Sequence, residues 1–408
     1  MIQQSKEISG QIRDLFCESA LNEQAQHLGY TKRKGKLSAF EFMLAVSQAL
    51  DDHGASCSLS QIGHVIHREL GISMTNEGIN NRFNSLGVEF VKSIFEKLLN
   101  LHIGCQPLDQ ALYTFNGVYL EDASNINLPT DLVSSFKGYG SDASDAALKL
   151  NLCYDIQGSN LRLRLKSATD NDQNGLTMGA PSKSLFIRDL GYFKGDEFKG
   201  LIKQGAYFIS RLPKCAKAYK RPNYRCAQHI DFEQLANSLE EGQIYDQEVY
   251  LNYKKRWKAR LVVIKLPKSK AEKRKARIVK QRRKKGKKVS AKTLALNDIN
   301  IYITNLCAEQ WAGQQIFQLY SVRWQIEIMF KAWKSVYRID ETKQNIKGDR
   351  ALFQLYIQLI QILLNTKIFQ SIGLISWTNH HRELSQIKGL QTIKVRLPQF
   401  FGQFNANP

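Results

Sequence analysis

The spacing of apolar residues changes twice along this 408-residue chain, and the change limits the folds open to it. Apolar residues recur at helical spacing through residues 40–50 and 88–101, but alternate with polar residues in 146–155 and 160–168. Alternation is typical of strands that have two different faces. Helical spacing returns from about residue 308. The pattern predicts a mixed α/β protein whose first part is all helical.

The spacing of apolar residues also predicts the remaining strands and helices and a division into domains. Four more segments are expected to be strands and one to be a helix, namely strands 112–121, 184–188, 206–212 and 299–306 and helix 195–205. Two strand-like pieces and a basic run separate the third of these strands from the fourth. We therefore predict a helical, helix-turn-helix-like DNA-binding domain at 1–105, a core at 106–212 and 299–375, a β-rich insertion at 213–298, and a tail at 376–408.

Positive charge is concentrated in one part of the chain. The sequence holds 58 Lys and Arg against 37 Asp and Glu, a formal net charge of +21. Between Lys268 and Lys292 there are 14 basic residues and one acid, Glu272. Such a run attracts phosphates because binding releases condensed counterions, so nucleic acid is the favoured partner. A solvated basic loop or a localisation signal is the alternative.

Residues 58–83 resemble a helix, a short turn and a second helix. A serine at 58 or 60 can cap the first helix, Gly71 can end it, and residue 75 or 76 can cap the second. If this is a DNA-binding helix-turn-helix, residues 80–82 face DNA, and Arg82 is the candidate contact. A plain helical hairpin is the alternative.

Several features favour a cytoplasmic protein. The seven cysteines contain no CxxC pair, and the first residues lack the apolar core of a signal peptide. Residues 351–369 are strongly apolar, but polar side chains interrupt them, so we expect a buried helix and no membrane partner. With DNA as the partner, the protein would be associated with the nucleoid.

Three acids stand out as candidate metal ligands. Asp122 closes the first expected core strand, Asp189 closes the fourth, and Glu327 lies in the helical stretch after residue 308. Carboxylates from separate elements can hold two Mg²⁺ ions, because hard cations prefer oxygen ligands. Two such ions activate an attacking oxygen and stabilise a leaving one in phosphodiester displacement. A strand-terminal Asp is also common as a turn residue or helix cap, which is the alternative.

The predicted helix around Glu327 supports the metal reading. Tyr320, Arg323, Glu327 and Lys334 fall within about 60° of one another on a continuous helix. The other sides of that helix are apolar, so most of it should be buried. A metal and a phosphate backbone would satisfy such a polar stripe.

These residues also carry a resemblance. Their spacing, Y-x2-R-x3-E-x6-K, resembles the signature of the insertion-sequence-four family of DDE transposases. The segment from Asp122 to Pro129 resembles the family's D-[GS]-[ST]-x-x-x-L-P element, with Ala123 where Gly or Ser is usual. The segment from Asp189 to Phe193 resembles its D-x-G-[YF]-[YF] element.

The resemblance implies an RNase H-like catalytic core with a β-rich insertion between the second Asp and the Glu. It implies that Asp122, Asp189 and Glu327 are catalytic and bind Mg²⁺, for which Mn²⁺ can substitute. Tyr320, Arg323 and Lys334 would hold phosphates while the enzyme cuts DNA and transfers the strand to target DNA. The N-terminal helices would bind terminal inverted repeats, and a homodimer would assemble on the paired DNA ends. Some members have a base-stacking Trp before the signature helix, where this chain has Tyr302.

Two other functions stay open. One is an RNase H-like nuclease that cuts DNA without joining ends. The other is a non-catalytic DNA-binding regulator in which the acids are structural.

Overall fold

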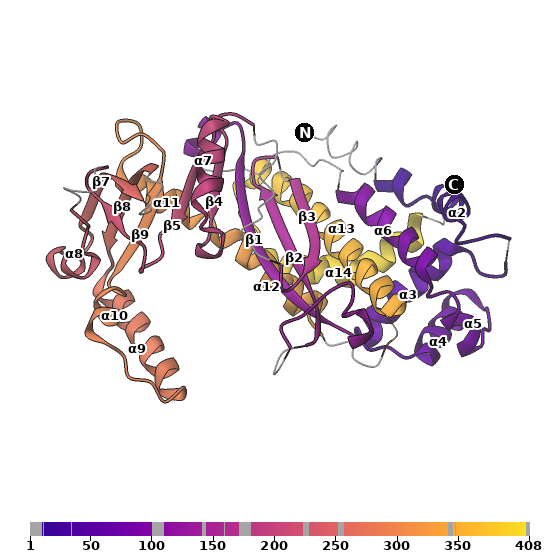
Figure 1. Ribbon diagram of the computed structural model, residues 1–408. Coiled ribbons are helices and arrows are strands. Elements are labelled where there is room, and N and C mark those ends of the chain that lie inside the picture. Colours follow the sequence, from indigo (N-terminus) through magenta and orange to yellow (C-terminus); the bar gives the residue numbers. More distant parts are fainter. Residues whose placement is uncertain are drawn as a thin grey trace. The chain divides into compact units, whose positions relative to one another are not determined.

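The computed structural model describes most of the chain as two compact units (Figure 1). The described residues are 10, 12–33, 35–99, 110–140, 144–158, 160–170, 181–222, 228–251, 257–341, 346 and 348–404. Unit 1 comprises Met1–Leu108, Ala123–Asn171 and Gln325–Pro408, and unit 2 comprises Asp109–Asp122 and Asp172–Trp324. The predicted boundary at 105/106 lies outside the described residues.

Strand β1 (Val118–Leu128) begins in unit 2 and ends in unit 1. In unit 2 the strands that follow it in order are β4 (Leu185–Arg188), β5 (Tyr207–Arg211), β9 (Ile299–Thr304), β8 (Trp257–Lys265), β7 (Ile244–Leu251) and β6 (Ala218–Tyr219). In unit 1 its neighbour is β2 (Ala146–Asp155), followed by β3 (Asn160–Ser167). Strands β1, β4 and β5 are parallel, whereas β2–β3 and the pairings from β5 to β6 are antiparallel.

Five α-helices accompany the strands in the described part of unit 2. They are α7 (Gly195–Lys203), α8 (Phe232–Ser238), α9 (Lys268–Lys284), α10 (Ala291–Ala295) and α11 (Gly313–Ser321). Phe198 of α7 packs on Phe208 of β5, with ring centroids 4.4 Å apart, and on Trp257 of β8 at 5.9 Å. These aromatic contacts bury one face of α7 against strands that belong to different parts of the sequence.

The insertion is less separate from the core than the sequence suggests. Its strand β8 pairs with β9 over six residue pairs, from Arg260–Thr304 to Lys265–Ile299. The insertion strands therefore continue the sheet beyond β9. The basic run forms α9, and the helices α8 and α10 add to the strands that were expected.

The N-terminal helices share one core with a long later helix in unit 1. They are α2 (Glu18–His27), α3 (Ala39–His53), α4 (Leu59–Leu70), α5 (Asn76–Asn80) and α6 (Ser85–Leu99). The later helix is α13 (Gly348–His380), which is flanked in sequence by α12 (Trp324–Tyr337) and α14 (Gln386–Phe404). Phe353 of α13 packs on Phe42 and Phe83, with ring centroids 5.7 and 5.3 Å apart.

Helix α13 contains the apolar segment that was expected to be a buried helix. By length and composition it could cross a membrane, and 59% of its most apolar window is buried within the described structure. Phe353, Leu355, Leu359 and Leu363 are fully buried. Their burial against α3 and α6 accounts for the apolar sequence in unit 1.

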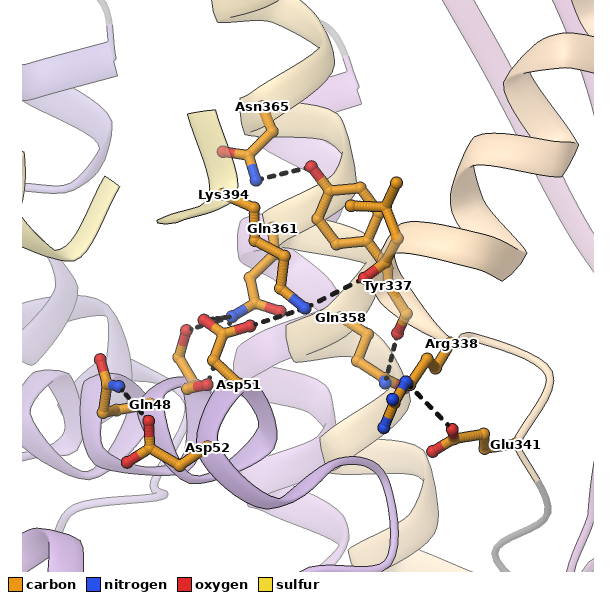
Figure 2. Close-up of polar contacts among 12 residues, drawn as sticks. Gln48, Asp51, Asp52, Tyr337, Arg338, Glu341, Gln358, Gln361, Asn365 and Lys394 are labelled. Carbon is orange, nitrogen blue, oxygen red and sulfur yellow. Dashed lines mark hydrogen bonds and ion pairs between the residues drawn. The ribbon is translucent and has the colours of Figure 1, made fainter. Parts of the chain in front are cut away.

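Polar contacts also join four helices of unit 1 (Figure 2). Lys394 of α14 lies 3.2 Å from Asp51 of α3, and it donates to the carbonyl oxygen of Val336 at 3.1 Å. Gln361 of α13 donates to the other oxygen of Asp51 at 3.0 Å. Burial raises the pKa of Asp51, and the ammonium group of Lys394 opposes that change.

Lys367, in α13, gives unit 1 a predicted pH dependence. The residue is 1% exposed, and burial lowers its pKa from 10.5 to about 8. Between these two pH values the unfolded chain binds more protons than the folded one, so the free energy of unfolding rises with pH. At 1.36 kcal/mol per pKa unit, the rise is about 3 kcal/mol.

We expect Lys367→Met to remove that rise. Urea unfolding of both proteins between pH 7 and about pH 10.5 would measure it as the difference in free energy of unfolding. Taking the difference cancels the titration of the tyrosines, which are common to both. A difference that stays constant over this range would contradict the prediction.

Candidate functional site

The two candidate aspartates lie where two adjacent parallel strands of unit 2 stop pairing with each other. In the register of β1 and β4, Glu121 is the partner of Arg188, and pairing between these strands stops there. Asp189 directly follows β4, whereas Asp122 lies within β1, which continues to Leu128, so Asp122 does not close its strand as expected. Asp189 has an extended backbone, with φ −79° and ψ 172°. Because side chains alternate along a strand, both aspartates lie beside the end of the β1–β4 pairing, on the face opposite to Glu121 and Arg188.

A buried ion pair lies behind the aspartates. Arg188 Nε is 2.5 Å from Glu121 Oε2, and both side chains are 0% exposed. Arg188 Nη1 also bonds to Glu197 Oε2 of α7 at 2.8 Å. A guanidinium held between two carboxylates fixes the register of β1 against β4 and so the spacing of Asp122 and Asp189. None of these three residues was predicted from the sequence, although a charged residue within an apolar strand is a signal of a buried ion pair.

Two signature residues contact Asp189. The hydroxyl of Tyr320, in the last turn of α11, donates to Asp189 Oδ1 at 3.2 Å. Arg323 Nε lies 4.0 Å from the same oxygen, and its guanidinium lies over the Tyr320 ring at 5.5 Å. Burial raises the pKa of Tyr320, so the phenol stays protonated and can donate. The Asp189 side chain is 39% exposed and so remains accessible from solvent.

Tyr302 supports this arrangement from strand β9. Its ring lies 4.8 Å from that of Tyr320, and the residue is 2% exposed. Burial raises its pKa to about 12. A ring so deeply buried packs against the signature tyrosine, and in this conformation it has no open face on which a base could stack.

The signature residues do not lie on one continuous helix, which corrects the expected stripe. Helix α11 ends at Ser321 and α12 begins at Trp324, so Arg323 lies in the turn between them. Most of the helix around Glu327 was expected to be buried, but Trp324 at its start is 61% exposed. Tyr320 at the end of α11 and Arg323 in the turn both approach Asp189.

Glu327 and Lys334 belong to unit 1, whereas Asp122, Asp189, Tyr320 and Arg323 belong to unit 2. Both lie on α12 and are partly buried. They are seven residues apart, so they point within about 20° of each other around the helix. Among the described residues, no group of three or more His, Cys, Asp or Glu side chains is close enough to hold a metal ion.

The region predicted to be a helix-turn-helix has the expected caps but a shorter second helix. Ser58 caps α4 in a capping box with Gln61, and Gly71 ends it in the left-handed conformation at φ 67°. Thr75 caps α5, which has only five residues and ends before Phe83. A helix of one turn offers fewer positions to a DNA groove than the sequence suggested.

Arg82 is engaged within the protein. Its Nη2 donates to the carbonyl oxygen of Leu37 at 2.6 Å, and its guanidinium lies over the Phe42 ring at 5.3 Å. These contacts hold the segment after α5 against the start of α3. They favour a structural role for Arg82, and its contact with DNA stays a prediction.

Comparison with known proteins places this geometry in context. The family model described as "Transposase DDE domain" matches residues 114–364. The chain is 33% identical over 406 residues to the transposase for insertion sequence element IS231E of Bacillus thuringiensis subsp. finitimus, a match covering 93% of this chain and 83% of the relative. It is 30% identical over 423 residues to the transposase for insertion sequence element IS1151 of Clostridium perfringens, with 98% and 89% covered.

Proposed function

The chain belongs to the transposases with a DDE domain, and from that premise we propose that it cuts DNA at the ends of an insertion sequence and joins them to target DNA. We propose further that it belongs to the insertion-sequence-four group, whose signature Tyr320, Arg323, Glu327 and Lys334 resemble. The observation that carries the proposal is the placement of Asp122 and Asp189 directly after the last paired residues of the parallel strands β1 and β4, with Tyr320 and Arg323 on Asp189.

The strand order supports an RNase H-like core. Strands β3, β2, β1, β4 and β5 follow one another in that order, with β2–β3 antiparallel and β1, β4 and β5 parallel. The first Asp lies within β1, directly after the residues that pair with β4, and the second Asp directly follows β4.

The donor chemistry at the sheet edge fits a divalent metal ion. Asp122 and Asp189 offer carboxylate oxygens, which Mg²⁺ and Mn²⁺ prefer, and we propose Glu327 as the third ligand. Bound there, the ions would stabilise charge on the attacking and leaving oxygens of a phosphodiester. The ligands come from three separate elements, so only the folded core can bring them together.

The other signature residues would orient the DNA. Tyr320 holds the Asp189 carboxylate through its hydroxyl. Arg323 and Lys334 carry the positive charge that phosphate oxygens require, and charge-assisted bonds of this kind fix a backbone in place. We propose that the N-terminal helices bind the terminal inverted repeats and that two copies assemble on the paired ends. The protein would then act in the cytoplasm, on nucleoid DNA and without a membrane.

Strand joining is the test that separates this function from its alternatives. Purified protein with Mg²⁺ and a duplex carrying the ends of its own insertion sequence should yield cut ends and, with a target plasmid, covalent junctions that sequencing can locate. Cut ends without junctions would favour the RNase H-like nuclease. Binding without any cleavage in Mg²⁺ or Mn²⁺ would favour the regulator and overturn the proposal.

A further inference from the structure

Helix α9 carries a straight row of cations on one side. Lys270, Lys273, Arg277, Lys280 and Lys284 are all exposed. At about 100° per residue they fall within an arc of about 80°, and they extend over about 21 Å along the axis. We call these five residues the stripe.

The opposite side of α9 is attached to unit 2. Ala271 is buried, Arg274 Nη1 donates to Asn300 Oδ1 at 2.8 Å, and Lys275 Nζ lies 2.6 Å from Asp298 Oδ1. These contacts centre roughly 130° around the helix from the stripe. The attachment therefore turns the stripe toward solvent, and Figure 1 shows α9 running outward from the strands β7, β8 and β9.

A second group of cations lies where α9 meets the sheet. Arg211 Nη2 and Arg274 Nη1 both donate to Asn300 Oδ1, at 3.1 and 2.8 Å, and Lys214 Nζ donates to Asn297 Oδ1 at 2.9 Å. In the described part of the chain, no carboxylate forms an ion pair with these three cations, which we call the Asn300 cluster. Neutral amides satisfy hydrogen bonds but leave the positive charge uncompensated.

Burial and mutual repulsion lower the pKa of two members of this cluster. Desolvation and then repulsion from Arg274 and Arg211 lower the pKa of Lys214. Desolvation and then Arg211 lower the pKa of Arg274, to which Arg277 of the stripe also contributes. Because these cations repel one another, binding of an anion between them stabilises the cluster.

The cluster connects the stripe to the catalytic edge. Arg211 is the register partner of Tyr302 in the β5–β9 pairing. Tyr302 packs on Tyr320, whose hydroxyl bonds to Asp189. All these residues belong to unit 2, and the positive charges of Arg211, Arg274 and Arg323 all act on the Tyr302 hydroxyl to oppose the rise in its pKa, so the Asn300 cluster and Arg323 lie near the same ring.

We propose that the Asn300 cluster and the stripe form a phosphate-binding track that holds the backbone of duplex DNA away from the reacting bond. The proposal rests on the proposed DNA-processing function and adds a second DNA surface to it. Duplex DNA carries one negative charge per about 1.7 Å of axis, so a rigid row about 21 Å long meets several phosphates at once. Contacts to the backbone alone read no sequence, which suits flanking or target DNA.

An anionic membrane fits the same helix less well. A helix that lies in a membrane interface needs a broad apolar face with large side chains. In α9 the large aliphatic residues are Ile278 and Val279, and Val279 is exposed among cations. The charge is therefore suited to a polyanion in water.

The test compares two variants of equal charge. In the stripe variant, Lys270, Lys273, Arg277, Lys280 and Lys284 become Gln. In the control variant, five exposed cations of the same run that lie off the stripe become Gln, namely Arg282, Lys285, Lys287, Lys288 and Lys292. Glutamine keeps the helix propensity of Lys and Arg, and circular dichroism would confirm that each variant stays folded.

Binding of a fluorescein-labelled duplex unrelated to the insertion sequence is measured by anisotropy over a range of KCl concentrations. The slope of log K against log [KCl] is negative, and each lost phosphate contact makes it less steep by about 0.9. The steepness should therefore fall by about four in the stripe variant and by about one at most in the control. The single change Lys214→Gln should reduce the steepness by about one. Equal losses in the stripe and control variants, or no loss in the stripe variant, would overturn the track.

Two further sets of measurements test which polyanion binds the track and whether the track can be judged independently of the proposed catalytic site. Duplex RNA or phosphatidylserine vesicles bound more tightly than duplex DNA would also overturn the proposal. The variants Asp122→Ala and Asp189→Ala should keep the wild-type salt slope while losing cleavage. If they still cleave DNA, the proposed catalytic site fails but the track can still be judged by its own slope.

Discussion

Replacing Asp122 or Asp189 with alanine is expected to abolish cleavage of a duplex that carries the element ends, a loss of at least about 10³-fold in rate. The two carboxylates directly follow the last residues that pair β1 with β4. Removing either takes away ligand oxygens that a second carboxylate cannot supply from the same place. Cleavage would be followed by gel electrophoresis with Mg²⁺ and, separately, Mn²⁺.

A matched control makes that result specific. Asp196 is also in unit 2, seven residues after Asp189, and its side chain is 81% exposed in the first turn of α7. Asp196→Ala should cleave at close to the wild-type rate. Full activity in Asp189→Ala, with DNA binding unchanged, would remove Asp189 from the proposed catalytic site.

The second large effect is expected from Arg188. Changing it to Met leaves Glu121, which is 0% exposed, without the guanidinium that lies 2.5 Å away. Breaking a buried ion pair by removing one partner costs about 3–5 kcal/mol, because a charge stays behind in a medium of low polarity. The free energy of unfolding, measured in urea, should fall by that amount. Cleavage should also fall, since the pair fixes the register beneath both aspartates.

The double variant Arg188→Met with Glu121→Leu tests why stability is lost. It distinguishes the cost of leaving the Glu121 charge unpaired from the loss of a contact that fixes the strand register. With both charges gone, most of the lost stability should return, because a buried pair and a packed apolar pair are often similar in free energy. Lys258→Met provides the surface control, since Lys258 and Glu248 are both more than half exposed and their pair should contribute little. If Arg188→Met were no less stable than Lys258→Met, the buried pair would not hold the strands.

Hydrophobic spacing predicted the strands close to their true bounds. Residues 146–155 form β2 as expected, and β3, β4 and β5 begin or end within about one residue of the prediction. The strand expected at 112–121 begins later, at Val118, because residues 110–114 form a 3-10 helix, and it ends later, at Leu128. Local side-chain patterns decide such elements, so the sequence contains the information.

The residues of the candidate site could be predicted only in part from the sequence. Asp122 and Asp189 could be chosen because each follows an apolar run, and their adjacency depended on the parallel pairing of β1 and β4. The break between α11 and α12 was missed, since the apolar spacing of residues 313–337 continues through it. The pairing of Glu121 with Arg188 was missed too, because the two residues are far apart in the chain and meet through strand register alone.

By itself, the sequence determined the types of element, the concentration of charge in 268–292 and the spacing of the signature residues, because all of these are local. Tertiary structure alone decided that Tyr320 and Arg323 reach Asp189, that Arg82 bonds to backbone carbonyls, and that the cations of α9 form one outward row. Contacts between distant segments depend on packing and strand register, and neither is set by the order of neighbouring residues.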